Sequence, residues 1–270
     1  MHRRPALIVA HPGHELVVFG WMEKSRPVVN ILTDGSGRNG VSRHSSTLKV
    51  LRETGAEPGD LAAAVTDRQL YAAILDGNIE MFVDLAVRLG DELSVRRPPY
   101  VAGDAREGFN PTHDICAMIV DAAVARARRS GAVIGNYKFS LFEPHYRHAG
   151  DARQRGICQV LSEEQVRRKL AAAHAYPELA AEVEWAFRGR SPKVLERYPD
   201  LASVFDAAID GMNERSFATE CLLPASTAST AEDRPFYELY GERLVADGTY
   251  EHAIRYRDHV KPIERALAAL

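Results

Sequence analysis

Two short apolar runs near the start of the chain each end abruptly in a polar turn. Residues 5–10, PALIVA, and the first part of residues 27–37, PVVNILTDGSG, show no alternation of apolar and polar positions, which is typical of strands buried on both faces. Residues 15–25, ELVVFGWMEKS, predict a helix between them. A strand, a helix and a strand within about 35 residues have the size of a parallel βαβ unit.

The alternation of helices and strands continues to about residue 150. Helices are predicted over residues 42–55, 67–93 and 111–131, and strands at the start of residues 98–114 and within residues 132–143. The second helical stretch is expected to break near Gly77, and Pro111 suits the first turn of the third. This pattern predicts an α/β fold whose mostly parallel sheet is flanked by helices.

The pattern changes in the second half of the chain, where the sequence becomes mainly helical. The helical stretches are residues 162–187, 200–212 and 250–270. We therefore expect a core domain over residues 1–155 and a helical C-terminal extension over residues 156–270, packed on that core. Whether this extension covers a site, binds a partner or only completes the core stays open at this stage.

Composition and charge are those of an ordinary globular protein. Apolar residues make up 46% and charged residues 26% of the 270 residues, and the formal net charge is −3. This balance gives no support to a nucleic-acid partner. No stretch approaches the roughly 18 consecutive apolar residues of a membrane span. The apolar run at 6–10 is also shorter than the core of a signal peptide.

The three cysteines, Cys116, Cys158 and Cys221, lie far apart in the sequence, and none belongs to a CxxC pair. They predict neither a disulfide framework nor a cysteine zinc site. A reducing compartment fits this usage, so we expect a cytoplasmic protein. The sequence does not indicate an oligomeric state.

Polar loops follow three of the predicted strands, and parallel sheets bind ligands at the carboxyl ends of their strands. Two of these loops carry histidines: His11 and His14 follow the first strand, and His113 opens a later helix. Three histidines with an open fourth position suit zinc and a bound water. The alternative is that these imidazoles only hydrogen-bond to the backbone of their loops.

The same loops resemble those of the zinc-dependent de-N-acetylases of the PIG-L/LmbE superfamily. Residues 10–15, AHPGHE, are similar to the family's AHPDDE, and residues 110–113, NPTH, are similar to its HxDH. The TDG at 33–35, followed by Arg43, is a weaker likeness. The resemblance extends over about residues 5–150 and implies a Rossmann-like fold and removal of acetyl groups from amino sugars or related glycosides.

The resemblance places the metal ligands on His11, His14 and His113, with Zn²⁺ as the expected ion and another divalent metal as an alternative. The middle ligand is an aspartate in the family. Three further positions differ, among them Thr112, which stands where the family has an orienting aspartate and cannot act as a carboxylate. The family's general base falls on Gly13, which cannot accept a proton, and its oxyanion-stabilising histidine falls on Asn110. An asparagine amide can still donate to an oxyanion.

Other acids in these loops are candidates for the missing base. Asp104 and Glu107 are the preferred substitutes, and Glu15 is a third candidate for which a supporting role is favoured over a catalytic one. Asp34 and Arg43 are expected to contact a substrate. For each acid the alternative is stabilisation at a helix N-terminus, and for the arginine it is a surface ion pair.

The sequence therefore predicts a metal-dependent amide hydrolase, acting on an amino sugar or glycoconjugate, with an atypical three-histidine site. Two alternatives remain: an inactive binding or regulatory homologue, and different metal-dependent chemistry in a biosynthetic pathway. A dinucleotide-binding enzyme is disfavoured because no GxGxxG follows the first strand.

Overall fold

The predicted α/β architecture is confirmed in a computed structural model that describes residues 3–37, 40–225 and 234–270. Seven strands form one sheet in the order β3-β2-β1-β4-β5-β7-β6, parallel from β3 to β5, with β7 antiparallel to both of its neighbours. The strands are β1 Ala6–Val9, β2 Val28–Thr33, β3 Glu57–Val65, β4 Tyr100–Asp104, β5 Gly135–Phe139, β6 Ile157–Val160 and β7 Thr219–Pro224.

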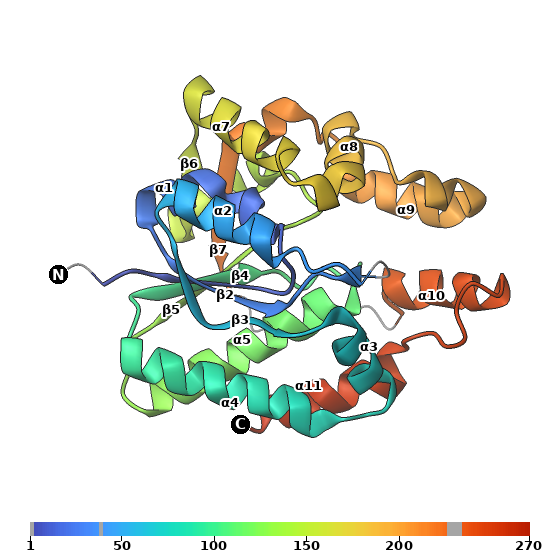
Figure 1. Ribbon diagram of the computed structural model, residues 1–270, viewed down its shortest axis with the longest axis horizontal. Coiled ribbons are helices and arrows are strands. Elements are labelled where there is room, and N and C mark those ends of the chain that lie inside the picture. Colours follow the sequence, from blue (N-terminus) through green and yellow to red (C-terminus); the bar gives the residue numbers. More distant parts are fainter. Residues whose placement is uncertain (1–2, 38–39, 226–233) are drawn as a thin grey trace.

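Helices cover both faces of this sheet (Figure 1). Those on one face include α1, α2 and α7, and those on the other include α4, α5 and α11 (Figure 1). The α-helices are α1 Phe19–Ser25, α2 His44–Thr54, α3 Asp67–Leu75, α4 Ile79–Arg96, α5 Pro111–Arg129, α6 Ala149–Arg155, α7 Glu163–His174, α8 Ala180–Arg188, α9 Pro199–Ile209, α10 Phe236–Ala246 and α11 Lys261–Ala268. In the described ranges, none of the helices has the length and apolarity needed to cross a membrane.

The central strand β1 is buried on both faces, as its unbroken apolar run predicts. Leu7 and Val9 pack with α1 and α7 residues such as Trp21 and Ala173. Ile8 belongs to the opposite cluster, which includes Phe82 of α4. The sheet thus separates two apolar layers, and its polar loops are confined to the strand ends.

Strand β3 is an element that the sequence did not predict. Its residues, EPGDLAAAV, contain proline, glycine and three alanines, none of which favours a strand. Apolar and polar residues do not alternate along it. Among the described strands it pairs with β2 alone, at the edge of the sheet, and its register is irregular. Tertiary pairing therefore overrides weak local preference in this segment.

The C-terminal part, residues 156–270, is mainly helical and also supplies β6 and β7 of the sheet. Glu220 of β7 ties it to the core. Its buried carboxylate accepts hydrogen bonds from the amides of Gly20 (2.9 Å) and Trp21 (2.6 Å) at the start of α1 and pairs with Lys169 of α7 (2.9 Å). A carboxylate at a helix N-terminus satisfies amides that have no partner within the helix.

Replacing Glu220 by alanine is expected to lower the free energy of unfolding by about 3–5 kcal/mol, because the buried Lys169 ammonium loses its counter-charge. Urea unfolding followed by circular dichroism measures the change. Glu196→Ala, at an exposed position, is the control. A loss no larger than that of the control would refute this role for Glu220.

Candidate metal centre and cavity

Three histidine rings converge at the carboxyl edge of the sheet. His11 follows β1, His14 begins a 3-10 helix, and His113 lies in the first turn of α5. The ring centroids are 5.4 Å apart for His11 and His14, 5.2 Å for His11 and His113, and 4.5 Å for His14 and His113. Strands β1 and β4 are neighbours, so the loops that follow them meet although they are a hundred residues apart.

Carboxylates hold two of the three rings through their Nδ1 atoms. His11 Nδ1 lies 3.1 Å from Asp67 Oδ1 and 2.7 Å from Thr33 Oγ1. His14 Nδ1 lies 2.9 Å from Asp104 Oδ2. A carboxylate that accepts a hydrogen bond from Nδ1 fixes the orientation and the tautomer of the ring. The lone pair of Nε2 is then available to a metal ion.

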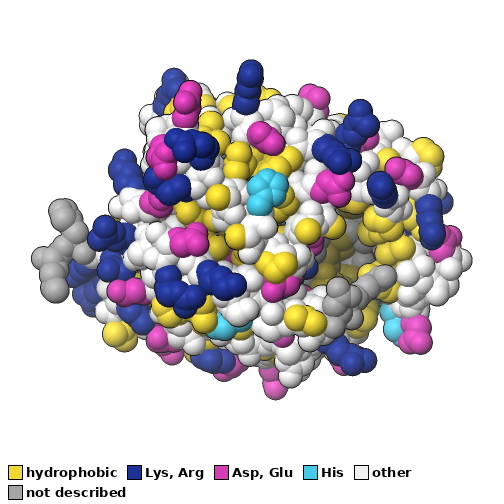
Figure 2. Space-filling view, turned by 45° about the horizontal axis from the view of Figure 1, so that its top comes forward, with side chains coloured by type: hydrophobic (Ala, Val, Ile, Leu, Met, Phe, Trp, Pro, Cys, Tyr) yellow, Lys and Arg dark blue, Asp and Glu magenta, His cyan; other side chains and the backbone are white. Residues whose placement is uncertain are grey.

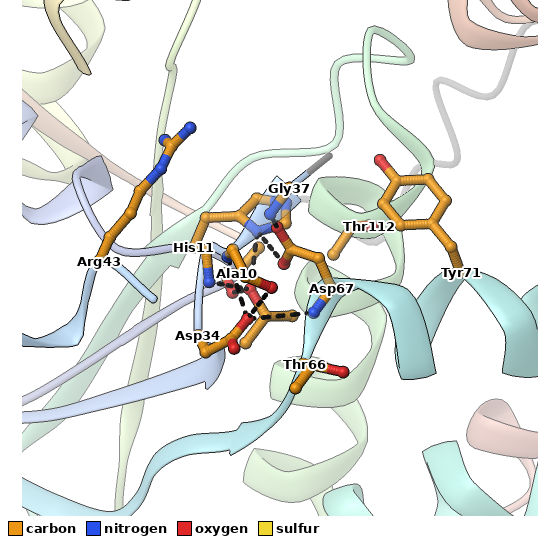
Figure 3. A network of polar contacts seen from close by, with 12 residues as sticks. Ala10, His11, Asp34, Gly37, Arg43, Thr66, Asp67, Tyr71 and Thr112 are labelled. Carbon is orange, nitrogen blue, oxygen red and sulfur yellow. Dashed lines mark hydrogen bonds and ion pairs between the residues drawn. The ribbon is translucent and has the colours of Figure 1, made fainter. Parts of the chain in front are cut away.

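Asp67 was not predicted from the sequence, because it follows β3, the strand that was missed. Its Oδ2 accepts from the amide of Gly37 (2.7 Å), and its own amide donates to Asp34 Oδ1 (3.2 Å). Figure 3 shows Asp67 and His11 turned toward each other and Arg43 turned away from them. Burial alone would raise the pKa of Asp67, but its hydrogen bonds with His11, with Thr33 and with the amide of Gly37 lower it.

The electrostatic setting favours neutral rings. Burial lowers the pKa of His113 well below its ordinary value, and the neighbouring His14 and His11 lower it further. Burial also lowers the pKa of His11. The Nδ1 atom of His113 is buried and has no hydrogen-bond partner among the described residues. A neutral imidazole with an unsatisfied nitrogen is the form that binds a metal ion.

The centroid distances between the three rings are close to those expected around a zinc ion. Three imidazoles on a tetrahedral zinc, with Zn–N distances of about 2.0–2.1 Å, would have centroids about 5 Å apart. Within the described residues, however, no three His, Cys, Asp or Glu side chains already have their donor atoms in the arrangement of a metal site. The fit therefore lies in the placement of the rings and in the orphaned nitrogen of His113, not in a preset donor geometry.

The three acids proposed as replacement bases have other contacts in the structure. Asp104 is fully buried, and its Oδ2 also accepts from the amide of Ala10 (2.8 Å). Glu107 accepts from the loop after β5, and burial raises its pKa to about 7. Glu15 is buried, and its Oε2 accepts from the amide of Gly13 (2.6 Å). None of the three lines the cavity beside the histidines.

The other predicted contacts surround that cavity. Asn110 caps α5, with its Oδ1 accepting from the amide of Thr112 (2.8 Å) and from the Tyr71 hydroxyl (3.4 Å). Asp34 braces its own loop through bonds from Ser36 and Asp67. Arg43 pairs with Glu182 of α8 at 3.3 Å. All three predicted residues line the cavity.

Gly13 stands where the resemblance places the general base, and the Leu179 side chain packs against it. Gly13 has a φ of +108°, and a Cβ added there would lie 2.3 Å from Cδ1 of Leu179. Leu179 belongs to the C-terminal part, just before α8. The positive φ favours a glycine at position 13, and a Cβ there would also force the Leu179 side chain to move.

The histidines face a cavity of about 1140 Å³ between the core and the C-terminal part. Its walls are mostly apolar, and Figure 2 shows the hollow lined largely by apolar side chains. A row of stacked rings leads outward from the centre. The ring centroids of His113 and Phe142 are 6.2 Å apart, and those of Phe142 and Trp185 of α8 are 6.3 Å apart with 6° between the ring planes. The C-terminal helices thus cover the site and supply one wall.

No protein family and no curated protein matches this sequence. A structural match is the conserved protein TT1542 from Thermus thermophilus, which is 16% identical over 86% of this chain and 100% of its own, with a TM-score of 0.48. Similarity at this level carries neither an activity nor site residues over to this chain.

Gly13→Ala is expected to lower the free energy of unfolding by about 2–4 kcal/mol, combining backbone strain with overpacking against Leu179. Gly131→Ala is the matched control, because Gly131 also has a positive φ (+83°) but open space around its Cβ. Thermal and urea unfolding measure both variants. Leu179→Ala should remove part of the cost of Gly13→Ala but none of that of Gly131→Ala. Equal costs at both glycines would contradict this account.

Proposed function

We propose that this protein is a metal-dependent hydrolase of an amide bond, acting on an N-acetylated amino sugar or glycoconjugate that carries an aromatic or apolar group. The observation that carries the proposal is the set of three converging imidazoles, two of them held by carboxylates, at the wall of a large cavity. The resemblance of the two histidine loops to the PIG-L/LmbE de-N-acetylases supports the reaction class.

His11, His14 and His113 would hold the metal, and zinc is the ion that suits a set of nitrogen ligands best. When bound, it would supply Lewis acidity, lowering the pKa of a water and polarising a carbonyl. Asp67 and Asp104 act as positioning residues, since each fixes one ligand ring through Nδ1.

Asn110 supports the reaction from the start of α5. Its Oδ1 is used by the amide of Thr112, so its Nδ2 hydrogens are left to donate to a developing oxyanion. The Tyr71 hydroxyl lies beside it and lines the same cavity. These groups would hold the acyl carbonyl next to the three rings.

Proton transfer needs an acid that reaches the cavity. The described acids that line it are Asp34, Asp67 and Glu182. Asp67 contacts a ring of the centre, but His11 and the amide of Gly37 use both of its oxygens and its pKa is lowered, so it acts as a positioning residue and not as the base. The roles first expected for Glu15, Asp104 and Glu107 stay predictions, and their contacts favour positioning.

A second function has its own support. Leu179 fills the space where the family's base would stand, which also suits a protein that binds a ligand and does not turn it over. Such a protein would keep the metal or the aromatic wall but release no acetate. Measuring acetate release together with ligand binding separates the two functions.

Purified wild-type protein supplied with zinc is expected to hold close to one zinc per chain, and His113→Ala to lose it. Asp104→Asn should weaken zinc affinity about 10–100-fold, because His14 loses the carboxylate that orients it. Elemental analysis and competition with a chelating dye measure both effects. His174→Ala, which removes an exposed histidine outside the cavity, is the control. Wild type that binds no zinc would overturn the hydrolase proposal.

Trp185→Ala is expected to raise KM about 3–10-fold for 4-nitrophenyl N-acetylglucosaminide, because the ring that stacks on Phe142 is lost. Acetate release measures the rate. Trp185→Phe should restore most of the affinity, and N-acetylglucosamine, which has no aryl group, should show an unchanged KM. The same rise for both substrates would argue against an aromatic subsite.

A further inference from the structure

Two cysteines that lie far apart in the sequence are side by side on neighbouring strands of the sheet. Cys158 of β6 and Cys221 of β7 are direct partners in the antiparallel register, 63 positions apart. Their sulfur atoms lie 2.9 Å apart, with both thiols free. The third cysteine, Cys116, is buried in α5.

The backbone around this pair has the arrangement that admits a disulfide. The amide of Leu161 donates to the carbonyl of Ala218, and hydrogen-bonded pairs alternate along an antiparallel ladder. Counting back three positions makes Cys158 and Cys221 a non-hydrogen-bonded pair. The amide of Cys221 agrees, because it points to His145 Nδ1 (3.0 Å) and not to β6. Such pairs have the closest Cα atoms, about 4.5 Å apart, within the range of disulfides.

The two thiols differ in access. Cys158 is half-buried on the edge strand β6, whereas Cys221 is only 2% exposed. Burial, together with the hydrogen bond to Cys158, raises the pKa of Cys221 to about 12. A reagent from solvent therefore meets Cys158 first, and Cys221 is placed to react with it from within the sheet.

We propose that Cys158 and Cys221 form a redox-sensitive modification site, which a low-molecular-weight disulfide oxidises to an intramolecular disulfide. The Cys158 thiolate attacks the small disulfide, forming a mixed disulfide and releasing one small thiolate. Cys221 then attacks Cys158 Sγ and passes its proton to the second small thiolate, which leaves as a thiol. The protein loses two electrons and two protons, and the small disulfide is reduced to two thiols.

The bond would close a loop that contains α7, α8 and α9. This loop carries Leu179, which covers Gly13, and Trp185, which belongs to the aromatic wall. Oxidation therefore fastens the edge strand β6 and both ends of the segment that covers the cavity. The site does not depend on the proposed hydrolase activity.

The test is to treat the reduced full-length protein with oxidised glutathione and count thiols after denaturation. Wild type should lose two of its three thiols and retain no glutathione, and peptide mapping should show residues 158 and 221 linked. Dithiothreitol should restore all three thiols. The oxidised form should melt at a temperature higher by about 5–10 °C.

Single serine variants separate the two steps. Cys221→Ser should keep glutathione on Cys158, and Cys158→Ser should stay unmodified, with no melting shift in either after treatment. Cys116 is the internal control and should stay reduced throughout. The proposal is overturned if wild type keeps three thiols, or if it retains a glutathione adduct on Cys158 without forming the link.

Discussion

One buried carboxylate connects the sheet to the candidate centre. Asp104 is the last residue of β4, and its Oδ2 accepts from the amide of Ala10, at the end of β1, and from the ring of His14. A carboxylate with no solvent exposure is tolerated only where partners replace water. The pairing of β1 with β4 supplies partners for Oδ2, whereas Oδ1 is buried with no hydrogen-bond partner among the described residues. The contacts of Oδ2 close the strand ends and orient the ring of His14. The position of the centre depends on this bond, because His11 directly follows Ala10 in the same turn.

The second constraint comes from the C-terminal part, which does more than enlarge the core. Glu220 holds the start of α1 from β7, and this fixes the 3-10 helix that begins at His14. Leu179 covers Gly13, and Trp185 extends the stack that begins at His113. Residues 156–270 therefore shape the cavity on one side, while the strand loops carry the polar groups on the other. Cooperation between the two parts sets what the site can accept.

The sequence was sufficient for the central strands and for the placement of the three histidines. Unbroken apolar runs such as residues 6–9 have one stable environment, between two layers of helices, and polar residues after such strands must meet at one edge. It was insufficient for β3, whose alanines have no strong strand preference, and so Asp67 was missed. The side-chain partners of Asp104 and Glu107 were also beyond reach, because hydrogen bonds between distant loops leave no local pattern. The meeting of Cys158 with Cys221 has the same cause, since it follows from the register of two strands 63 positions apart.

The contact between Gly13 and Leu179 decides how the site differs from the resemblance. A carboxylate at position 13 would need both an ordinary backbone conformation and the volume that the leucine occupies. Restoring the base therefore takes more than one substitution, and it would remove part of the apolar cover of the cavity. In the proposed site a neutral histidine would replace the usual aspartate ligand, so the metal complex would be one unit more positive, which would favour loss of a proton from a bound water. Loss of the base and gain of a neutral ligand would thus be chemically compatible in the proposed hydrolytic site.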